Sequence, residues 1–175
     1  FLGIKEEVPA ETESPAEKKN EPAVPDNVVL SPLAEKLALE SVPDATFAQG
    51  VLGQGAAIEP SEGKVIAPAD GTVSTIFDTH HAVGLTLDSG AELLIHIGIN
   101  TVELNGEGFT AHVSEGDRVT RGQTLITFDK EFIASKGYNT ITPVIVSNSD
   151  DYAEVKRLAD GNISSGDVLL ELAKG

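Results

Sequence analysis

Residues 77–109 read FDTHHAVGLTLDSGAELLIHIGINTVELNGEGF. Two runs in this stretch, 82–87 and 92–97, place apolar side chains at every second position, which is typical of β-strands. The Asp-Ser-Gly sequence at 88–90 lies between them and is typical of a turn, so the stretch predicts a hairpin with a three-residue loop. Turn signals of this kind recur every ~8–12 residues from Val28 onward, and that spacing favours an all-β sandwich or barrel.

The same reasoning predicts further strands and a few short helical turns. Strands are expected at 63–67, 71–76, 82–87, 92–97, 109–112, 124–128, 141–146 and 168–172. Helical turns are expected at 32–39, 130–137 and 151–158.

A weak internal repeat adds detail to this fold class. The pattern V-x-x-G-x-x-L at 119–125 returns as I-x-x-G-x-x-L at 163–169, each time before an apolar strand. These units, and the sequence APADGTV at 67–73, resemble biotinyl and lipoyl carrier domains, in which a glycine turn leads into a strand of a flattened barrel. We therefore expect a duplicated hybrid-motif β-sandwich. A carrier function does not follow, because Lys130 lacks the hairpin-tip motif of those domains.

Composition excludes several classes of partner. The 28 acidic residues outnumber the 12 basic ones and give a net charge of −16. Nucleic acids and anionic lipids attract clusters of Lys and Arg, so a basic protein surface is a better partner than either. No apolar run approaches the ~18–20 residues that cross a bilayer, so we expect no direct membrane insertion of this chain. The absence of Cys excludes disulfides and thiolate metal sites and fits a cytoplasmic location.

The N-terminal 27 residues differ in character from the rest. Residues 5–27 hold four of the nine prolines and many charges but no aromatic side chain, a composition that buries too little apolar surface to offset the entropy of ordering. We expect a flexible linker at 1–27, with the apolar residues 1–4 as the tail of a preceding domain, and one functional domain at 28–175. The chain starts at Phe1 and contains no Met, which favours a piece of a longer protein.

Two histidines on neighbouring strands are the candidates for chemistry. Alternation along the second strand of the hairpin places Leu93, Ile95 and Ile97 on one face and His96 on the other. Gly98 follows on the face of His96 and leaves room for a ligand beside the imidazole.

The register of the hairpin complicates this picture for His81. A three-residue loop pairs residues whose numbers add to 178, as 87 and 91 do, so that Ala82 lies opposite His96 and His81 lies opposite Ile97. Strict alternation would then put His81 and His96 on different faces. A shared site needs a bulge or kink near 80–83, or a loop with an even number of residues. From the residues alone, phosphoryl transfer, metal binding and plain packing all remain open.

Several longer motifs carry a resemblance to a known protein family. They are VPD at 42–44 with FA at 47–48, IAPADG at 66–71, THHA at 79–82, ELLIHIGINTVEL at 92–104, GEGF at 106–109, TPV at 142–144 with SN at 147–148, and GD at 166–167. Together they resemble the IIA domain of the glucose family of the bacterial phosphotransferase system, from about Val28 to the C-terminus.

This resemblance implies a phosphocarrier, a phosphotransferase component of sugar uptake. The histidine of the family's H-x-G-I-x-T-V-x-L motif accepts a phosphoryl group, which assigns that role to His96. The histidine of the T-x-H-A motif, here His81, steadies the phosphate, and Thr79 orients it through a hydrogen bond. Phosphate would arrive from the phosphohistidine of HPr and leave for a cysteine of a IIB domain. We expect that domain to belong to the same membrane-embedded permease, to which this chain would be tethered in the cytoplasm.

The resemblance also implies a surface that receives the basic face of HPr. The expected apolar patch consists of Phe47, Val51, Leu94, Ile97 and Val102, and the expected acidic rim of Asp44 and Glu103. Asn100 stands where well-known members carry Asp, which weakens the rim.

Two rival functions use the same histidines. No cofactor is required for phosphoryl transfer, but a Zn²⁺ ion could bridge His81 and His96 to a carboxylate of a partner. Zinc peptidases with a related sandwich carry an H-x-H pair that this sequence lacks, so hydrolysis is not expected. A regulatory binding module without transfer activity is the second rival, and the presence of both histidines argues against it.

Overall fold

The computed structural model describes residues 28–30, 54–60, 62–157 and 168–173. In this part of the chain the strands are β1 (Val28–Leu30), β2 (Gln54–Ile58), β3 (Lys64–Ile66), β4 (Gly71–Ile76), β5 (Ala82–Leu87), β6 (Glu92–His96), β7 (Phe109–Ala111), β8 (Arg118–Val119), β9 (Thr124–Phe128), β10 (Thr142–Val146), β11 (Glu154–Arg157) and β12 (Val168–Ala173). The helical elements are the 3-10 turns η3 (Thr101–Leu104) and η4 (Ser149–Asp151) and the α-helix α3 (Lys130–Ser135).

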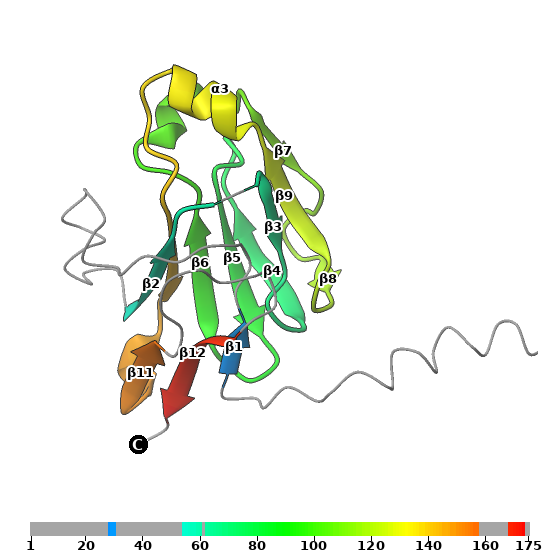
Figure 1. Cartoon of the computed structure of the whole chain (residues 1–175). Helices are drawn as coiled ribbons and strands as arrows, with labels where there is room; N and C mark the ends of the chain where they lie inside the picture. Colours follow the sequence, from blue (N-terminus) through cyan, green and yellow to red (C-terminus); the bar gives the residue numbers. More distant parts are fainter. Residues whose placement is uncertain (1–27, 31–53, 61, 158–167, 174–175) are drawn as a thin grey trace, which may run out of the picture.

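The strands form three antiparallel sheets, and Figure 1 shows the small sheet of β1, β12 and β11 at one end of the molecule. The largest has the order β2-β10-β6-β5-β4-β8, and the two smaller ones have the orders β3-β9-β7 and β1-β12-β11. All three contribute to one apolar core, as Val65 of β3, Leu85 of β5 and Leu170 of β12 illustrate, each with no exposed surface. The expectation of an all-β sandwich is therefore confirmed.

The hairpin formed by β5 and β6 has the predicted register. Ala82 lies opposite His96 and Thr86 lies opposite Glu92, pairs that each add to 178. Leu87 and Ala91 close the three-residue loop through a hydrogen bond of 2.8 Å from the backbone N–H of Leu87. Both strands lie in the interior of the six-stranded sheet, which explains why nearly every residue of β5 is buried.

The eight predicted strands are all present, with boundaries that differ by no more than one residue at either end. Strands β1, β2, β8 and β11 are additional to the prediction. The helix expected at 130–137 is α3, where the Asp129 side chain caps the N-terminus by accepting a hydrogen bond of 3.0 Å from the N–H of Phe132. The helix expected at 32–39 and the linker expected at 1–27 lie outside the described residues.

The helix expected at 151–158 is wrong. Only the short turn η4 is helical there, and β11 follows it and pairs with β12 from Glu154↔Ala173 to Arg157↔Leu170. Glu154 is exposed while Val155 packs against the core, a two-residue alternation that suits a strand. Pairing with a distant strand thus outweighs the local helix propensity.

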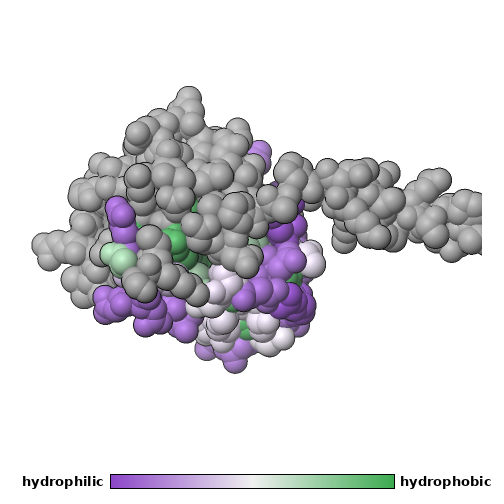
Figure 2. Space-filling model, turned by 90° about the horizontal axis from the view of Figure 1, so that it is seen from below, coloured by the Kyte–Doolittle hydropathy of each residue, from purple (hydrophilic) through white to green (hydrophobic). Residues whose placement is uncertain are grey.

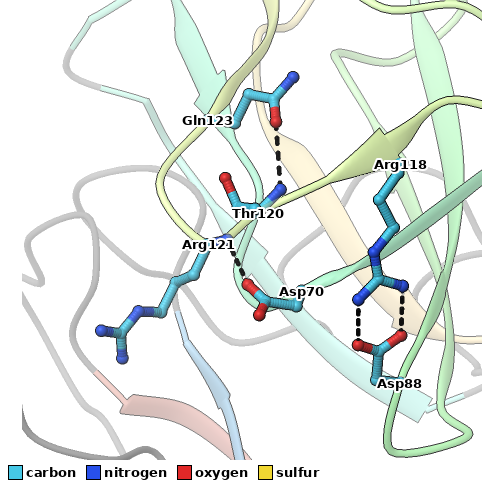
Figure 3. A network of polar contacts seen from close by, with 6 residues as sticks. All are labelled: Asp70, Asp88, Arg118, Thr120, Arg121 and Gln123. Atoms are coloured by element: carbon cyan, nitrogen blue, oxygen red, sulfur yellow. Dashed lines mark hydrogen bonds and ion pairs between the residues drawn. The ribbon is translucent and has the colours of Figure 1, made fainter. Parts of the chain in front are cut away.

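The first unit of the internal repeat forms a glycine turn that leads into β9. Hydrogen bonds join the two motifs at 67–73 and 119–125 at this turn. Ala67 exchanges backbone hydrogen bonds with Gly122 and Gln123. A side-chain oxygen of Asp70 accepts a hydrogen bond of 2.8 Å from the N–H of Arg121 (Figure 3). Beside this turn, Arg118 forms an exposed two-pronged ion pair with Asp88. Residues 163–167 of the second unit lie outside the described residues.

The two ends of the sandwich differ. One end carries α3 and η3, and the opposite end carries β1, β11 and β12 (Figure 1). Figure 2 looks onto that opposite end, where the coloured residues are mainly hydrophilic, with apolar atoms between them. None of the helices in the described part of the chain has the length and apolar character needed to cross a membrane.

Candidate functional site

The histidine pair lies at the end of the six-stranded sheet that carries α3 and η3. His96 is the last residue of β6, and His81 immediately precedes β5. The pairing of the two strands continues one step past the Ala82–His96 pair, because the N–H of Ile97 donates to the carbonyl of His81 at 2.7 Å. Both histidines are therefore anchored by the same pair of central strands.

A turn before β5 provides the kink that a shared site requires. His80 has a left-handed backbone, with φ of 58°, and its N–H donates to the carbonyl of Phe77 at 2.7 Å. The N–H of Phe77 in turn bonds to the carbonyl of Ala82 at 3.1 Å. This turn interrupts the strand alternation just before His81, so His81 need not follow the faces of β5.

The structure brings the two imidazole rings together. The ring centroids of His81 and His96 are 4.8 Å apart and the planes meet at 80°, an edge-to-face arrangement. On its other side, the ring of His81 meets the ring of Phe77 at 5.2 Å and 72°. His81 is only 2% exposed, whereas His96 is half-buried and reaches solvent.

The hydrogen bond of His96 fixes its tautomer. Its Nδ1 lies 2.7 Å from the carbonyl oxygen of Gly98. A carbonyl oxygen can only accept, so Nδ1 carries the proton and the lone pair of the neutral ring is on Nε2. Nε2 is therefore the nitrogen of His96 that can act as a nucleophile.

The environment of His81 keeps its ring neutral. Burial, and to a smaller extent the charge that His96 can carry, lowers the pKa of His81 from 6.5 to about 4. Thr79 Oγ1 lies 2.6 Å from Nδ1 of His81. A neutral ring that accepts from the Thr79 hydroxyl carries its proton on Nε2, where it can serve as a hydrogen-bond donor.

The loop after β6 is tightly packed around Gly98, which has φ of 78°. A Cβ atom at this position would lie 2.5 Å from Cγ2 of Thr101 and 2.8 Å from the carbonyl oxygen of Asn139. Thr101 has no exposed surface, and its hydroxyl donates to the carbonyl of Ile97 at 2.5 Å. Only glycine fits both the backbone angle and the space.

Several exposed side chains lie close to the two histidines in the sequence. Val102, with 48% of its surface exposed, and Phe77, with 41%, are the exposed large apolar side chains among the described residues. Asn100 and Glu103 are also exposed, and Glu103 accepts a hydrogen bond of 3.0 Å from the hydroxyl of Tyr138. Sequence reasoning selected Val102, Asn100 and Glu103 but missed Phe77, whose position just before the T-x-H-A motif was the available signal.

The structure corrects part of the expected partner surface. Ile97 is fully buried and cannot line a surface patch, because it continues the core face of Leu93 and Ile95. Leu94, on the opposite face, is half-buried against a small second cluster that includes Ile99 and Ile145. Asp44, Phe47 and Val51 lie outside the described residues.

The residues that the structure describes contain no group of three or more His, Cys, Asp or Glu side chains that could hold a metal ion. His81 and His96 are close enough to share a ligand, but a tetrahedral Zn²⁺ site would need further ligands from elsewhere.

Comparison with solved structures identifies the class. The fold matches glucose permease IIA from Mycoplasma capricolum with a TM-score of 0.74 and 35% sequence identity, over 82% of this chain and 93% of that one. A mostly-β sandwich with a histidine pair at one end of its large sheet thus places the protein among IIA-type domains.

Sequence comparison identifies the family. Residues 27–152 match the family model described as phosphoenolpyruvate-dependent sugar phosphotransferase system, EIIA 1. The chain belongs to this family, and is therefore a phosphocarrier component of that system.

Relatives of this chain occur in two forms. The chain is 46% identical over 158 residues to the glucose-specific EIIA component of Halalkalibacterium halodurans, covering 89% of this chain and 91% of that protein. It is 47% identical over 169 residues to the β-glucoside-specific EIIBCA component of Dickeya chrysanthemi, covering 94% of this chain but only 27% of that protein. The coverage is also 27% for the corresponding component of Bacillus subtilis.

Proposed function

We propose that Nε2 of His96 accepts a phosphoryl group from the phosphohistidine of HPr and passes it to a cysteine of a IIB domain. The Nε2 lone pair forms the new N–P bond while the N–P bond of the donor breaks, and the donor imidazole leaves with the bonding electrons. The second transfer repeats this exchange with a thiolate as the attacking group. No metal is needed for either step, since positioning and charge stabilisation supply the catalysis.

One observation carries this proposal: the hydrogen bond between Nδ1 of His96 and the carbonyl of Gly98. It supports a nucleophilic Nε2 at neutral pH, and the half-buried position of His96 supports access for a partner. An N–P bond is labile enough for onward transfer, unlike a serine phosphate ester.

His81 has a complementary role in this proposal. A neutral His81 with its proton on Nε2 can donate a hydrogen bond to a phosphoryl oxygen on His96, and Thr79 would hold the ring in that tautomer. The low pKa of His81, about 4, and the 4.8 Å between the rings support this assignment.

The experiment is phosphorylation in a defined mixture. The protein is incubated with HPr, the first enzyme of the system and ³²P-labelled phosphoenolpyruvate, and the labelled residue is mapped. We expect label on His96 and none in His96→Gln, while the exposed His112→Gln variant serves as the matched control and should label normally. Equal labelling of His96→Gln would refute the assignment.

We further infer that the exposed residues around the pair, Phe77, Asn100, Val102 and Glu103, face both partners in turn. Val102 and Phe77 offer apolar contact, and Glu103 offers a negative charge for a basic donor surface. The EIIBCA composition of the β-glucoside-specific relatives supports a IIB domain in the same polypeptide, with exchange in the cytoplasm beside a membrane-embedded permease. Glucose and β-glucosides are the candidate sugars, because the relatives are named for them.

Zinc binding is an alternative function of the same pair, as a bridge between this chain and a partner. His81 and His96 could supply two ligands and a partner carboxylate a third, which the proximity of the rings supports. Titration of Zn²⁺ into the chain alone and into a mixture with HPr separates the cases: zinc-dependent association that is lost in His96→Gln would support this bridge, and its absence would remove it.

A further inference from the structure

Thr101 is a buried residue close in sequence to His96. It is the first residue of η3, five residues after His96, and has no exposed surface. Its hydroxyl donates to the carbonyl of Ile97 at 2.5 Å, and its methyl group fills the space beside Gly98. Both contacts are made to the backbone of Ile97 and Gly98. This backbone connects His96 to the Gly98 carbonyl that its ring binds.

The peptide planes on either side of Gly98 explain why these contacts matter. The carbonyl oxygen of Gly98 and the N–H of Ile99 belong to one trans peptide plane and point in opposite directions. The N–H of Ile99 donates to the carbonyl of Asn139 at 3.0 Å, which turns the Gly98 oxygen the other way, towards Nδ1 of His96. The plane before Gly98 contains the Ile97 carbonyl, which the Thr101 hydroxyl holds.

Gly98 has two soft dihedral angles and no side chain, so its backbone would otherwise rotate with little resistance. A small rotation would lengthen the 2.7 Å contact to His96 and allow the proton to reside on Nε2 instead. Because the alternative tautomer has no lone pair on Nε2, any population of it subtracts from the reactive form of His96.

We propose that Thr101 is a positioning residue for His96: by donating its hydroxyl to the Ile97 carbonyl, Thr101 fixes the peptide plane before Gly98, holds the Gly98 carbonyl on Nδ1 and so maintains the reactive tautomer. This role rests on the proposed function of His96 as the phosphoryl acceptor. The hydroxyl of Thr101 has this role, whereas the methyl group only packs beside Gly98.

Two substitutions separate the hydroxyl from the methyl group. Thr101→Val keeps the shape and removes only the donor to Ile97, whereas Thr101→Ser keeps the donor and removes only the methyl group. Thr142→Val is the matched control, because Thr142 is also fully buried and its hydroxyl donates to a backbone carbonyl, that of Thr140 at 3.0 Å. Thermal unfolding of each variant establishes that it is folded at the temperature of the other measurements.

The first readout is the ¹⁵N NMR spectrum of the His96 ring in the unphosphorylated full chain. Wild type, Thr101→Ser and Thr142→Val should give the Nδ1–H tautomer, and Thr101→Val should give a mixture of both. The second readout is phosphate transfer from phospho-HPr, in which Thr101→Val should lower kcat about 10-fold, the scale of one hydrogen bond, with KM unchanged.

Retention of the single Nδ1–H tautomer in Thr101→Val would overturn the proposal, and so would an equal change of tautomer in Thr142→Val. Failure of the proposed function is distinguishable from both. If wild type accepts no phosphate, the assignment of His96 fails, while the tautomer comparison on unphosphorylated protein still decides whether Thr101 positions its ring.

Discussion

His96 ends β6 and His81 directly precedes β5, one residue beyond the Ala82 that pairs with His96, yet the two rings meet edge to face with centroids 4.8 Å apart. The turn at 77–81, with its left-handed residue His80, makes this possible because it frees His81 from the alternation of β5. The pair is asymmetric: His81 is buried and held neutral, while His96 reaches solvent. In the proposed function, this asymmetry makes His81 the hydrogen-bond donor and His96 the nucleophile.

The first prediction concerns His81. Replacement by Ala, which has no hydrogen-bond donor in its side chain, should still permit phosphate to enter on His96, because the nucleophile and its Gly98 partner remain. The onward transfer to a IIB domain should slow by ~10²-fold or more, the usual effect of removing one charge-stabilising donor. Single-turnover transfer from the phosphorylated protein measures this step directly. An unchanged onward rate would show that His81 does not act on the phosphoryl group.

The second prediction concerns Thr79. Its hydroxyl lies 2.6 Å from Nδ1 of His81, so Thr79→Val leaves that nitrogen without the partner that sets the tautomer. We expect the onward transfer to slow about 10-fold, whereas Thr79→Ser, which keeps a hydroxyl, should transfer at nearly the wild-type rate. The same ¹⁵N spectrum that reports on His96 resolves the His81 tautomer. If the valine and serine variants behave alike, the hydroxyl has no orienting role.

The third prediction follows from the pKa of His81, which is about 4 in the folded protein and near 6.5 in the unfolded chain. Between pH 4 and pH 6.5 the unfolded chain binds more protons than the folded protein, so the free energy of unfolding rises with pH. The rise is complete above about pH 6.5. Lowering the pH from 7 to 4 should therefore reduce the free energy of unfolding by up to about 3 kcal/mol.

Denaturant unfolding at several pH values measures this slope in wild type and in His81→Gln. The variant should lose that part of the pH dependence, whatever its stability at neutral pH. His112→Gln removes an exposed histidine instead and should keep the wild-type slope. A His81→Gln variant with an undiminished slope between pH 4 and 6.5 would contradict the low pKa of His81.

Sequence reasoning captured the elements whose pattern is local. The three-residue turn at 88–90 fixed the register of β5 and β6, and alternation placed His96 opposite in face to Ile95. It could not specify the turn around His80, because no sequence pattern marks a histidine that adopts a left-handed backbone conformation.

Non-local contacts account for the other differences. Strand β11 forms because β12 lies beside it, although its sequence alone allows a helix. Ile97 was assigned to the surface through the motif that contains it, while the alternation of β6 already placed it in the core. The hydrogen bond from Tyr138 to Glu103 joins segments 35 residues apart, which no local pattern predicts.

The last prediction concerns Gly98, through which the fold and the chemistry are connected. An alanine there would need a left-handed backbone, at roughly 1–2 kcal/mol, and would also bring its Cβ within 2.5 Å of Thr101 Cγ2 and 2.8 Å of the Asn139 carbonyl oxygen. Crowding of this kind in a packed site costs a further ~1–3 kcal/mol.

Gly116 provides the matched control for Gly98. It has φ of 92°, and a Cβ atom there would meet no atom within 4 Å. Gly116→Ala should therefore lose only the roughly 1–2 kcal/mol of the backbone strain, and denaturant unfolding should rank it clearly above Gly98→Ala in stability. We expect relief of the crowding to disturb the contact between the Gly98 carbonyl and His96, so that Gly98→Ala also accepts phosphate more slowly at temperatures where it is fully folded. Equal losses of stability in the two variants would mean that the loop after β6 yields easily, and that the carbonyl facing His96 is not rigidly held.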